Sequence, residues 1–402
     1  MTYDTNIKPP SDTFCVLPWV HIATNASGTL RPCCNSKHGM NNFIDPKDGR
    51  AYRFGTAPIE EYWNSEDYKN LRRALLNGEK PEVCQRCWRE EETGVESLRQ
   101  AWMHRWLEDK EYTEEADLDI RYADIRLGTL CNLKCRMCNP YASSMWVDEW
   151  NDAYPDQQIS DHQKEWILEG TTGKHLGKLD TIVENFEKMI PSLEEVYFTG
   201  GEPTIILDAQ YLFLDRMIES GRAKKIKIKY NTNLTNVPQK LLDKWSHFKL
   251  IKLNVSIDGI GDLDRYIRYP SNWDKIEENF MKVRQMDNMA NEIHFTVQMY
   301  NILRLPEFLD WAKPLGHKIY LNILNHPDQL NIRVLPTELK ELAVKRLQLY
   351  LDIPRVQGVI DYMMAEDWSN KLPRFVEFTN KLDENRDQNI LDVNPEFKDI
   401  FI

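Results

Sequence analysis

The chain has 402 residues, enough for two or three domains, and combines 42% hydrophobic with 28% charged residues, the balance of a globular protein. Its net charge of −12 argues against a nucleic-acid partner, which selects a basic face. We find no apolar run of about 18 residues and no signal-peptide pattern, so we expect no membrane contact. Eight cysteines without a secretion signal favour metal ligation or catalysis in a reducing, cytoplasmic compartment.

The first segment, residues 1–107, gathers five of the eight cysteines around short elements. Asn25 to Gly28 predicts a hairpin turn. Ser65 is the expected N-cap of a helix that ends near Gly78. A second amphipathic helix carries Trp102 and Trp106, which we expect to pack against the following domain. The cysteines around these elements are Cys15, Cys33, Cys34, Cys84 and Cys87. Four of them would suffice for a structural zinc site.

The second segment, residues 120–325, alternates strands with helices. The expected strands are Ala123–Leu127, Glu195–Phe198, Ile226–Tyr230, Leu253–Ile257, Ile293–Met299 and Ile319–Leu324. The expected helices are Ala142–Trp150, Tyr211–Ile218, Leu241–Trp245, Ile276–Met286 and Leu305–Trp311. Helical crossovers between strands predict an α/β fold with a parallel sheet. The polar stretch Gln158–Leu179 predicts an inserted loop, and the basic patch Arg222–Lys229 predicts a solvated sheet edge or strand flank.

The third segment, residues 326–402, is predicted to be a helical extension. Its expected helices are Pro336–Tyr350, Val356–Met364 and Leu372–Leu382, followed by a polar break at Asp383–Asp387. We expect the chemistry to lie outside this extension, although its helices could close an open barrel.

Three cysteines, Cys131, Cys135 and Cys138, follow the first strand of the second segment. Thiolates are soft ligands that select zinc, Cu(I) or iron–sulfur clusters. A structural zinc site closes with four ligands, whereas these three have no fourth Cys or His nearby. The spacing therefore favours a cluster with one open coordination position, and a zinc site completed from elsewhere in the chain is the alternative.

Polar and glycine-rich residues follow the next strands, at the end where α/β barrels collect their reactive groups. The second strand ends in Gly200-Gly201-Glu202-Pro203. The third strand runs into Asn231 and Asn233, and the fourth into Ser256 and Asp258, with Arg265 and Arg268 shortly after. Gln298 and Asn301, at the end of the fifth strand, are expected either to line a substrate cavity or to be satisfied polar groups.

The pattern Cys-x-x-x-Cys-x-x-Cys after a first strand resembles the radical S-adenosylmethionine (radical SAM) superfamily. The resemblance implies a partial (β/α)6 TIM-like barrel whose 4Fe–4S cluster sits on Cys131, Cys135 and Cys138. It further implies that the open iron binds SAM. One electron from reduced flavodoxin or ferredoxin then cleaves SAM to methionine and a 5′-deoxyadenosyl radical, which abstracts hydrogen from a substrate.

The same resemblance implies a set of SAM contacts. The Gly-Gly-Glu motif holds the methionyl amino group, the fourth strand end contacts the ribose or carboxylate, and an arginine pairs with the carboxylate. Residue by residue, the implied contacts are Met137, Gly200, Gly201, Glu202, Pro203, Asn231, Asn233, Ser256, Asp258 and Arg268. Met137 stands where the family places an apolar side chain against adenine.

The N-terminal cysteines resemble the twitch domain, the shorter relative of the SPASM domain. This resemblance implies an auxiliary 4Fe–4S cluster on Cys15, Cys33, Cys84 and Cys87, with Cys34 as the alternative to Cys33. The chain departs from the family pattern in one respect, because this segment precedes the radical SAM core instead of following it.

The sequence thus predicts a radical SAM enzyme, an oxidoreductase that modifies a peptide or protein, as many SPASM enzymes do. The first alternative is oxidation or rearrangement of a small molecule such as a sugar, aminoglycoside or nucleoside. An alternative of another class is a zinc-stabilised binding scaffold without turnover. We find no P-loop, G-x-S-x-G or H-E-x-x-H motif, so nothing in the sequence indicates hydrolysis or phosphoryl transfer.

Overall fold

The computed structural model describes residues 7–37, 43–172 and 177–401. Its strands are β1 His21–Thr24, β2 Leu30–Arg31, β3 Ile44–Asp45, β4 Arg50–Ala51, β5 Tyr122–Arg126, β6 Glu195–Thr199, β7 Lys227–Thr232, β8 Leu250–Ser256, β9 Met289–Val297 and β10 Lys318–Ile323. The N-terminal helices are α1 Leu17–Val20, α2 Ile59–Trp63, α3 Glu66–Leu76, α4 Gln85–Glu92 and α5 Leu98–Trp106. Those of the core are α6 Trp150–Ala153, α7 Asp161–Glu169, α8 Leu179–Met189, α9 Leu207–Glu219, α10 Gln239–Trp245, α11 Asp262–Ile267, α12 Trp273–Val283 and α13 Leu305–Ala312. The C-terminal helices are α14 Thr337–Leu347, α15 Val356–Ala365, α16 Leu372–Arg386, α17 Ile390–Val393 and α18 Lys398–Phe401.

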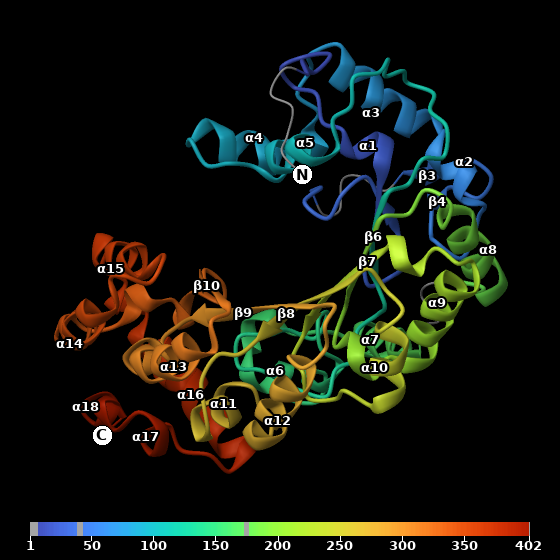
Figure 1. The fold of residues 1–402 in the computed structure, drawn as a ribbon. Coiled ribbons are helices and arrows are strands. Elements are labelled where there is room, and N and C mark those ends of the chain that lie inside the picture. The colour runs from blue at the N-terminus through green and yellow to red at the C-terminus, as the bar shows by residue number, and fades with distance from the viewer. Residues whose placement is uncertain (1–6, 38–42, 173–176, 402) are drawn as a thin grey trace.

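Strands β5 to β10 form one parallel sheet in chain order, as predicted. Alternate side chains of each strand face the core helices: Phe198 of β6 stacks with Phe213 of α9, and Tyr230 of β7 contacts Trp245 of α10. Figure 1 shows these helices along the outer side of the curved sheet, with the N-terminal helices at one end and the C-terminal helices at the other. The architecture is an open, partial α/β barrel whose inner face carries the other half of the strand side chains, which are mostly polar.

The N-terminal hairpin continues this sheet, which was not expected. β1 pairs in parallel with β5, and β2 pairs antiparallel with β1, so the sheet has eight strands. The predicted turn at Asn25 to Gly28 joins β1 to β2, and Gly28 adopts φ +74° there. The N-terminal domain and the core therefore share the main-chain hydrogen bonds of one sheet. Without the other domain, each would expose an unpaired backbone edge, that of β1 or that of β5.

Helix α5 covers the inner face where the strands begin. Trp102 stacks on Tyr122 of β5 with ring centroids 4.5 Å apart, and Arg105 pairs with Glu195 of β6 at 2.6 Å. The expectation that these tryptophans pack against the following domain is confirmed for Trp102. Ser65 also caps α3 as predicted, because its side chain accepts from the amide of Tyr68.

Two predictions between β5 and β6 are wrong. The stretch 158–179 is not a loop throughout, because Ser160 and Gln163 form a capping box that starts α7; residues 173–176 of the stretch lie outside the described residues. The stretch 142–150 is not one helix: a 3-10 turn at Ser144–Trp146 precedes α6. Its side chains hold the cysteine loop instead, since Ser143 donates to the Leu133 carbonyl at 2.6 Å and Trp146 donates to the Cys135 carbonyl at 3.0 Å.

The predicted polar break at Asp383–Asp387 is also wrong at its start, because α16 continues to Arg386. Asp383 and Arg386 are buried and form ion pairs with residues of the core. A polar run at a helix end indicates a loop only when nothing neutralises its charges.

Within the described ranges, no helix combines the length and apolar character that a membrane-spanning segment needs.

Candidate metal and cofactor site

The loop after β5 brings Cys131, Cys135 and Cys138 into one neighbourhood. Burial, together with the charge of a neighbouring thiolate, raises the pKa of Cys131 to about 11 and the pKa values of Cys135 and Cys138 to about 12. Thiols in such surroundings become thiolates only when a nearby positive charge, such as a metal centre, offsets the buried charge. Without such a positive charge, these three thiols would therefore stay protonated.

The glycine-rich loop after β6 packs directly on this cysteine loop. The amide of Gly201 donates to the Gly128 carbonyl at 3.1 Å, and the amide of Glu202 donates to the Leu130 carbonyl at 2.8 Å. A Cβ on Gly201 would lie 2.1 Å from the Leu130 oxygen. Pro203 opens a short 3-10 turn and its carbonyl accepts from Gln210 at 2.7 Å. The motif thereby fixes the backbone from which the cysteines extend.

Glu202 lies behind this loop, where protein groups occupy both of its carboxylate oxygens. Oε1 accepts from the Thr204 amide, the Thr204 hydroxyl and the Thr232 hydroxyl at 2.7–2.9 Å, and Oε2 accepts from the Asn233 amide at 2.6 Å. Burial raises the pKa of Glu202, and these hydrogen bonds counteract the rise. The carboxylate joins the ends of β6 and β7, so its oxygens are committed to the protein.

The two predicted asparagines after β7 differ in their surroundings. Asn233 is buried, and its amide nitrogen donates to Asn132 of the cysteine loop at 3.1 Å. Asn231 is exposed on the inner face and accepts from Asn254 of β8 at 2.8 Å. Asn233 therefore positions the cysteine loop, whereas Asn231 is accessible to a ligand.

Beyond β8, Asp258 and Arg268 form a buried ion pair at 2.5 Å beside Cys135. Asp258 also accepts from the Thr296 amide at 2.7 Å, and the Asn301 amide donates to the Asp258 carbonyl at 3.0 Å. Asn301 is thus a supporting polar group. Arg268 keeps one donor, Nε, without a partner among the described residues.

The remaining residues predicted at these strand ends are Ser256, Arg265 and Gln298. Ser256 is half-buried at the end of β8. Arg265 is more than half exposed and lies 3.7 Å from Asp262, so Arg268 is the arginine at the cysteines. The side chain of Gln298 is fully buried, and its Oε1 has no partner among the described residues.

Met137 and Cys138 line a pocket of about 360 Å³ between the cysteine loop and the segment after β10. Trp150 and Tyr154 form part of its wall, together with His326 and Gln329. A methionine beside a half-buried cluster cysteine provides a soft apolar surface for a flat ring. The pocket is a feature that strand-end motifs alone could not reveal, because residues 326–329 lie beyond the last strand.

The N-terminal cysteines form a second group, made of Cys15, Cys33, Cys84 and Cys87. Burial raises the pKa values of Cys15 and Cys33 to about 12 and also raises those of Cys84 and Cys87. Mutual repulsion adds to the rise, because Cys84 lies close to the other three thiols. Cys34 departs from this group, since its thiol interacts with Asp124 of β5 on the inner face of the sheet. The structure thus gathers the four expected thiols, with Cys33 rather than Cys34 among them.

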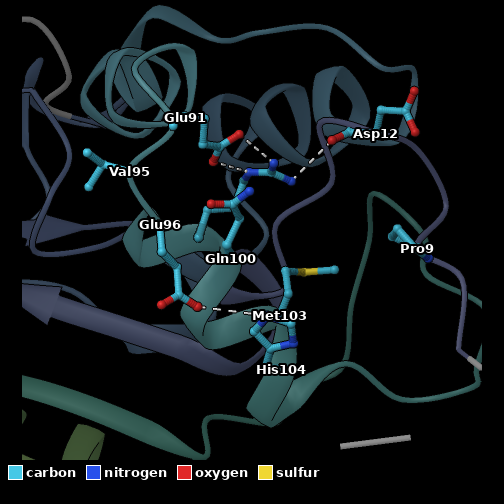
Figure 2. Close-up of a pocket in the computed structure, with 10 residues that line it drawn as sticks. Pro9, Asp12, Glu91, Val95, Glu96, Gln100, Met103 and His104 are labelled. Atoms are coloured by element: carbon cyan, nitrogen blue, oxygen red, sulfur yellow. Dashed lines mark hydrogen bonds and ion pairs between the residues drawn. The ribbon is translucent and has the colours of Figure 1, made fainter. Parts of the chain in front are cut away.

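A pocket of about 550 Å³ lies beside this second group, between α4 and α5. Figure 2 shows Glu91 and Asp12 on one side of it, and Glu96 opposite His104, with which it pairs at 3.9 Å. Arg99, which also lines the pocket, pairs with Glu91 at 2.6 Å, and its charge counteracts the rise in the pKa values of Cys15 and Cys87. A half-buried guanidinium therefore already neutralises part of the charge that these thiolates would carry.

In the described part of the chain, no three or more His, Cys, Asp or Glu side chains form a group that could hold one metal ion. The soft donor set and its burial fit an iron–sulfur cluster, whose ligands are thiolates.

Comparisons with known proteins agree with this chemistry. Residues 125–312 match the radical SAM superfamily model, and residues 15–88 match the SPASM model, described as an iron–sulfur cluster-binding domain. A comparison with curated protein sequences finds no match.

Solved structures with some similarity include native anSMEcpe with bound AdoMet, at 14% identity and a TM-score of 0.41. That match covers 61% of this chain and 62% of the other, so the chain spans about three fifths of its length. SuiB of Streptococcus suis bound to the precursor peptide SuiA gives 15% identity and a TM-score of 0.33, over 78% of this chain and 64% of the other.

The two family matches place the two cysteine groups in two separate domains. Cys131, Cys135 and Cys138 lie within the first matched range, and the four N-terminal thiols lie within the second. Such domains imply 4Fe–4S clusters and SAM as cofactors. The chain thus carries a radical SAM domain over residues 125–312 and, on the N-terminal side of it, a SPASM iron–sulfur domain over residues 15–88.

Proposed function

We propose that this protein is an enzyme that reductively cleaves SAM and uses the resulting 5′-deoxyadenosyl radical to abstract hydrogen from a substrate. The observation that carries the proposal is the group of three thiols, held by the glycine loop and adjoined by a buried Asp258–Arg268 pair. A 4Fe–4S cluster bound at these thiols would supply one electron and an open coordination position.

The residues of the chain would bind and orient SAM around the three thiols. Main-chain groups of Gly200 and Gly201 would face the methionyl end, because Glu202 is committed to the protein. The unpartnered Nε of Arg268 offers a charge-assisted hydrogen bond to the SAM carboxylate. Met137 would bound the adenine, and Asn231, exposed at the end of β7, is available to a hydroxyl of the ribose.

We further propose that Cys15, Cys33, Cys84 and Cys87 hold the auxiliary cluster, and that reduced flavodoxin or ferredoxin supplies electrons. The SPASM resemblance favours a peptide or protein as substrate. A small molecule such as a sugar, aminoglycoside or nucleoside is the second possibility, and product analysis with candidate substrates distinguishes the two.

The test uses anaerobically reconstituted protein. The wild type should hold about eight irons per chain, as two 4Fe–4S clusters require, and should release 5′-deoxyadenosine from SAM when reduced. A triple Cys131/Cys135/Cys138→Ala variant should keep about four irons and lose SAM cleavage. SAM cleavage by this variant would contradict the proposal.

A matched pair of variants tests the auxiliary ligands. Cys33→Ala should lose the auxiliary cluster, whereas Cys34→Ala should retain it, because the Cys34 thiol faces Asp124. Mössbauer or EPR spectra of the two proteins measure this difference, and the reverse pattern would make Cys34 the ligand.

A further inference from the structure

Lys229 lies in the middle of the sheet, on the inner face away from the helices. It stands beside Tyr197 of β6, which in turn stands beside Asp124 of β5. Its neighbours in sequence, Ile228 and Tyr230, are fully buried on the opposite, helix-covered face. The expectation of a solvated edge or strand flank is therefore wrong for Lys229, because β7 is a central strand.

The ammonium of Lys229 has no carboxylate partner among the described residues, although it is half-buried. It lies 4.5 Å from the centroid of the Tyr197 ring. The acids of the same face have other partners: Glu195 pairs with Arg105 and Lys227, and Glu292 pairs with Lys252 at 2.8 Å.

A second cation on this face, Arg126, is also incompletely paired. Its Nε has no acceptor among the described residues, and one terminal nitrogen makes only a 3.5 Å contact with the Tyr141 carbonyl. Arg126 ends β5 and lies near Cys138, so it stands between Lys229 and the cysteine loop.

Asp124 is the one acid near both cations, and it does not pair with either at ion-pair distance in the described structure. It accepts instead from the Thr199 hydroxyl at 3.3 Å. Two poorly solvated cations and one acid leave a net positive charge, which is costly unless an anion joins them.

We propose that Lys229 and Arg126 bind an oxyanion group of the substrate, either a carboxylate or a phosphate. The guanidinium suits two-point binding of such a group, and the ammonium serves as a point charge. The inference rests on the proposed function, because it takes the inner face below the cysteine loop as the place where the substrate lies. For a peptide substrate, it identifies an acidic side chain or a C-terminal carboxylate near the modified position.

Lys252 provides a matched control for Lys229. The two lysines are direct neighbours across β7 and β8, but only Lys252 has a carboxylate partner, Glu292. The lysines of the reconstituted enzyme are methylated chemically, by reductive methylation, while SAM is bound. The reaction is carried out in glutarate, in inorganic phosphate or in chloride, at equal ionic strength. Mass spectrometry then measures the modification rate of each lysine.

We expect glutarate, phosphate or both to slow modification of Lys229 several-fold while that of Lys252 is unchanged. Protection by phosphate alone would identify a phosphate group, and protection by glutarate alone a carboxylate. Equal Lys229 rates in all three salts would overturn the proposal.

Thermal unfolding gives an independent measurement. An anion that binds only the folded protein raises its Tm, so the anion-dependent rise should disappear in Lys229→Met and persist in Lys252→Met. Persistence of the full rise in Lys229→Met would also overturn the proposal. Failure of the proposed function would be seen separately, as reconstituted wild-type enzyme that releases no 5′-deoxyadenosine.

Discussion

At the scale of single residues, the glycines of the Gly-Gly-Glu motif allow two loops to touch. Gly200 adopts φ +139°, a conformation that other residues rarely adopt, and a Cβ there would lie 3.0 Å from the Gly128 oxygen. Gly201 has a φ that other residues also adopt, but there is no space for a side chain, because a Cβ would lie 2.1 Å from the Leu130 oxygen. The second glycine is thus required by the approach of the cysteine loop, whether or not a ligand is bound.

The variant Gly201→Ala should therefore displace the cysteine loop and lose the cluster on it. We expect iron to fall from about eight to about four per chain, with loss of SAM cleavage. Gly358→Ala is the control, because a Cβ on Gly358 of α15 meets nothing within 4 Å. Full iron content and normal 5′-deoxyadenosine release in Gly201→Ala would contradict this account.

At the scale of elements, α16 of the C-terminal extension holds the cysteine loop. The fully buried guanidinium of Arg136, next to Cys135, lies 3.6 Å from the Tyr266 ring and pairs with Asp383 at 2.5 Å. One turn further, Arg386 pairs with Glu149, which also pairs with Lys134 of the cysteine loop. The extension contributes to the site by neutralising charges that the loop buries.

Replacing Asp383 with Ala leaves Arg136 buried without its counter-ion. Breaking a buried pair in this way typically costs about 3–5 kcal/mol, so the free energy of unfolding should fall by about that amount. The radical SAM cluster should also be lost faster to a chelator, as measured by its visible absorbance. Glu384→Ala, an exposed change on the same helix, should have neither effect. A less stable protein with unchanged cluster loss would show that α16 does not hold the loop.

At the scale of the whole molecule, one sheet spans both iron–sulfur domains. β1 supplies the outer neighbour of β5, and α5 covers the inner face through Trp102 and Arg105. Removing residues 1–107 would expose the backbone edge of β5 together with the apolar surface beneath α5.

A fragment of residues 108–402 should consequently aggregate when expressed alone. Co-expression of residues 1–107 as a separate chain should restore solubility, because it supplies the missing strand and helix. Size-exclusion chromatography of the two preparations measures the difference. If the isolated fragment is monomeric and unfolds at the same temperature as the full chain, the shared sheet is not needed for folding.

The parts that the sequence predicted well are those encoded locally. The six core strands are apolar or alternating runs, and the spacing of the cysteines indicates metal ligation directly. The parts that it missed depend on partners far along the chain. From the sequence, Asp383 is predicted to lie in a polar break, because its ion-pair partner Arg136 stands nearly 250 residues earlier. Lys229 is likewise predicted to be a surface residue, because the sequence alone does not show that its strand lies in the centre of the sheet.

The pairing of β1 with β5 also has a consequence for biosynthesis. β1 ends at Thr24 and β5 begins at Tyr122, so the hairpin leaves the ribosome well before its partner strand exists. During that interval one backbone edge of β1 stays open to other nascent chains. Folding of the first domain is therefore completed only when translation has reached the core.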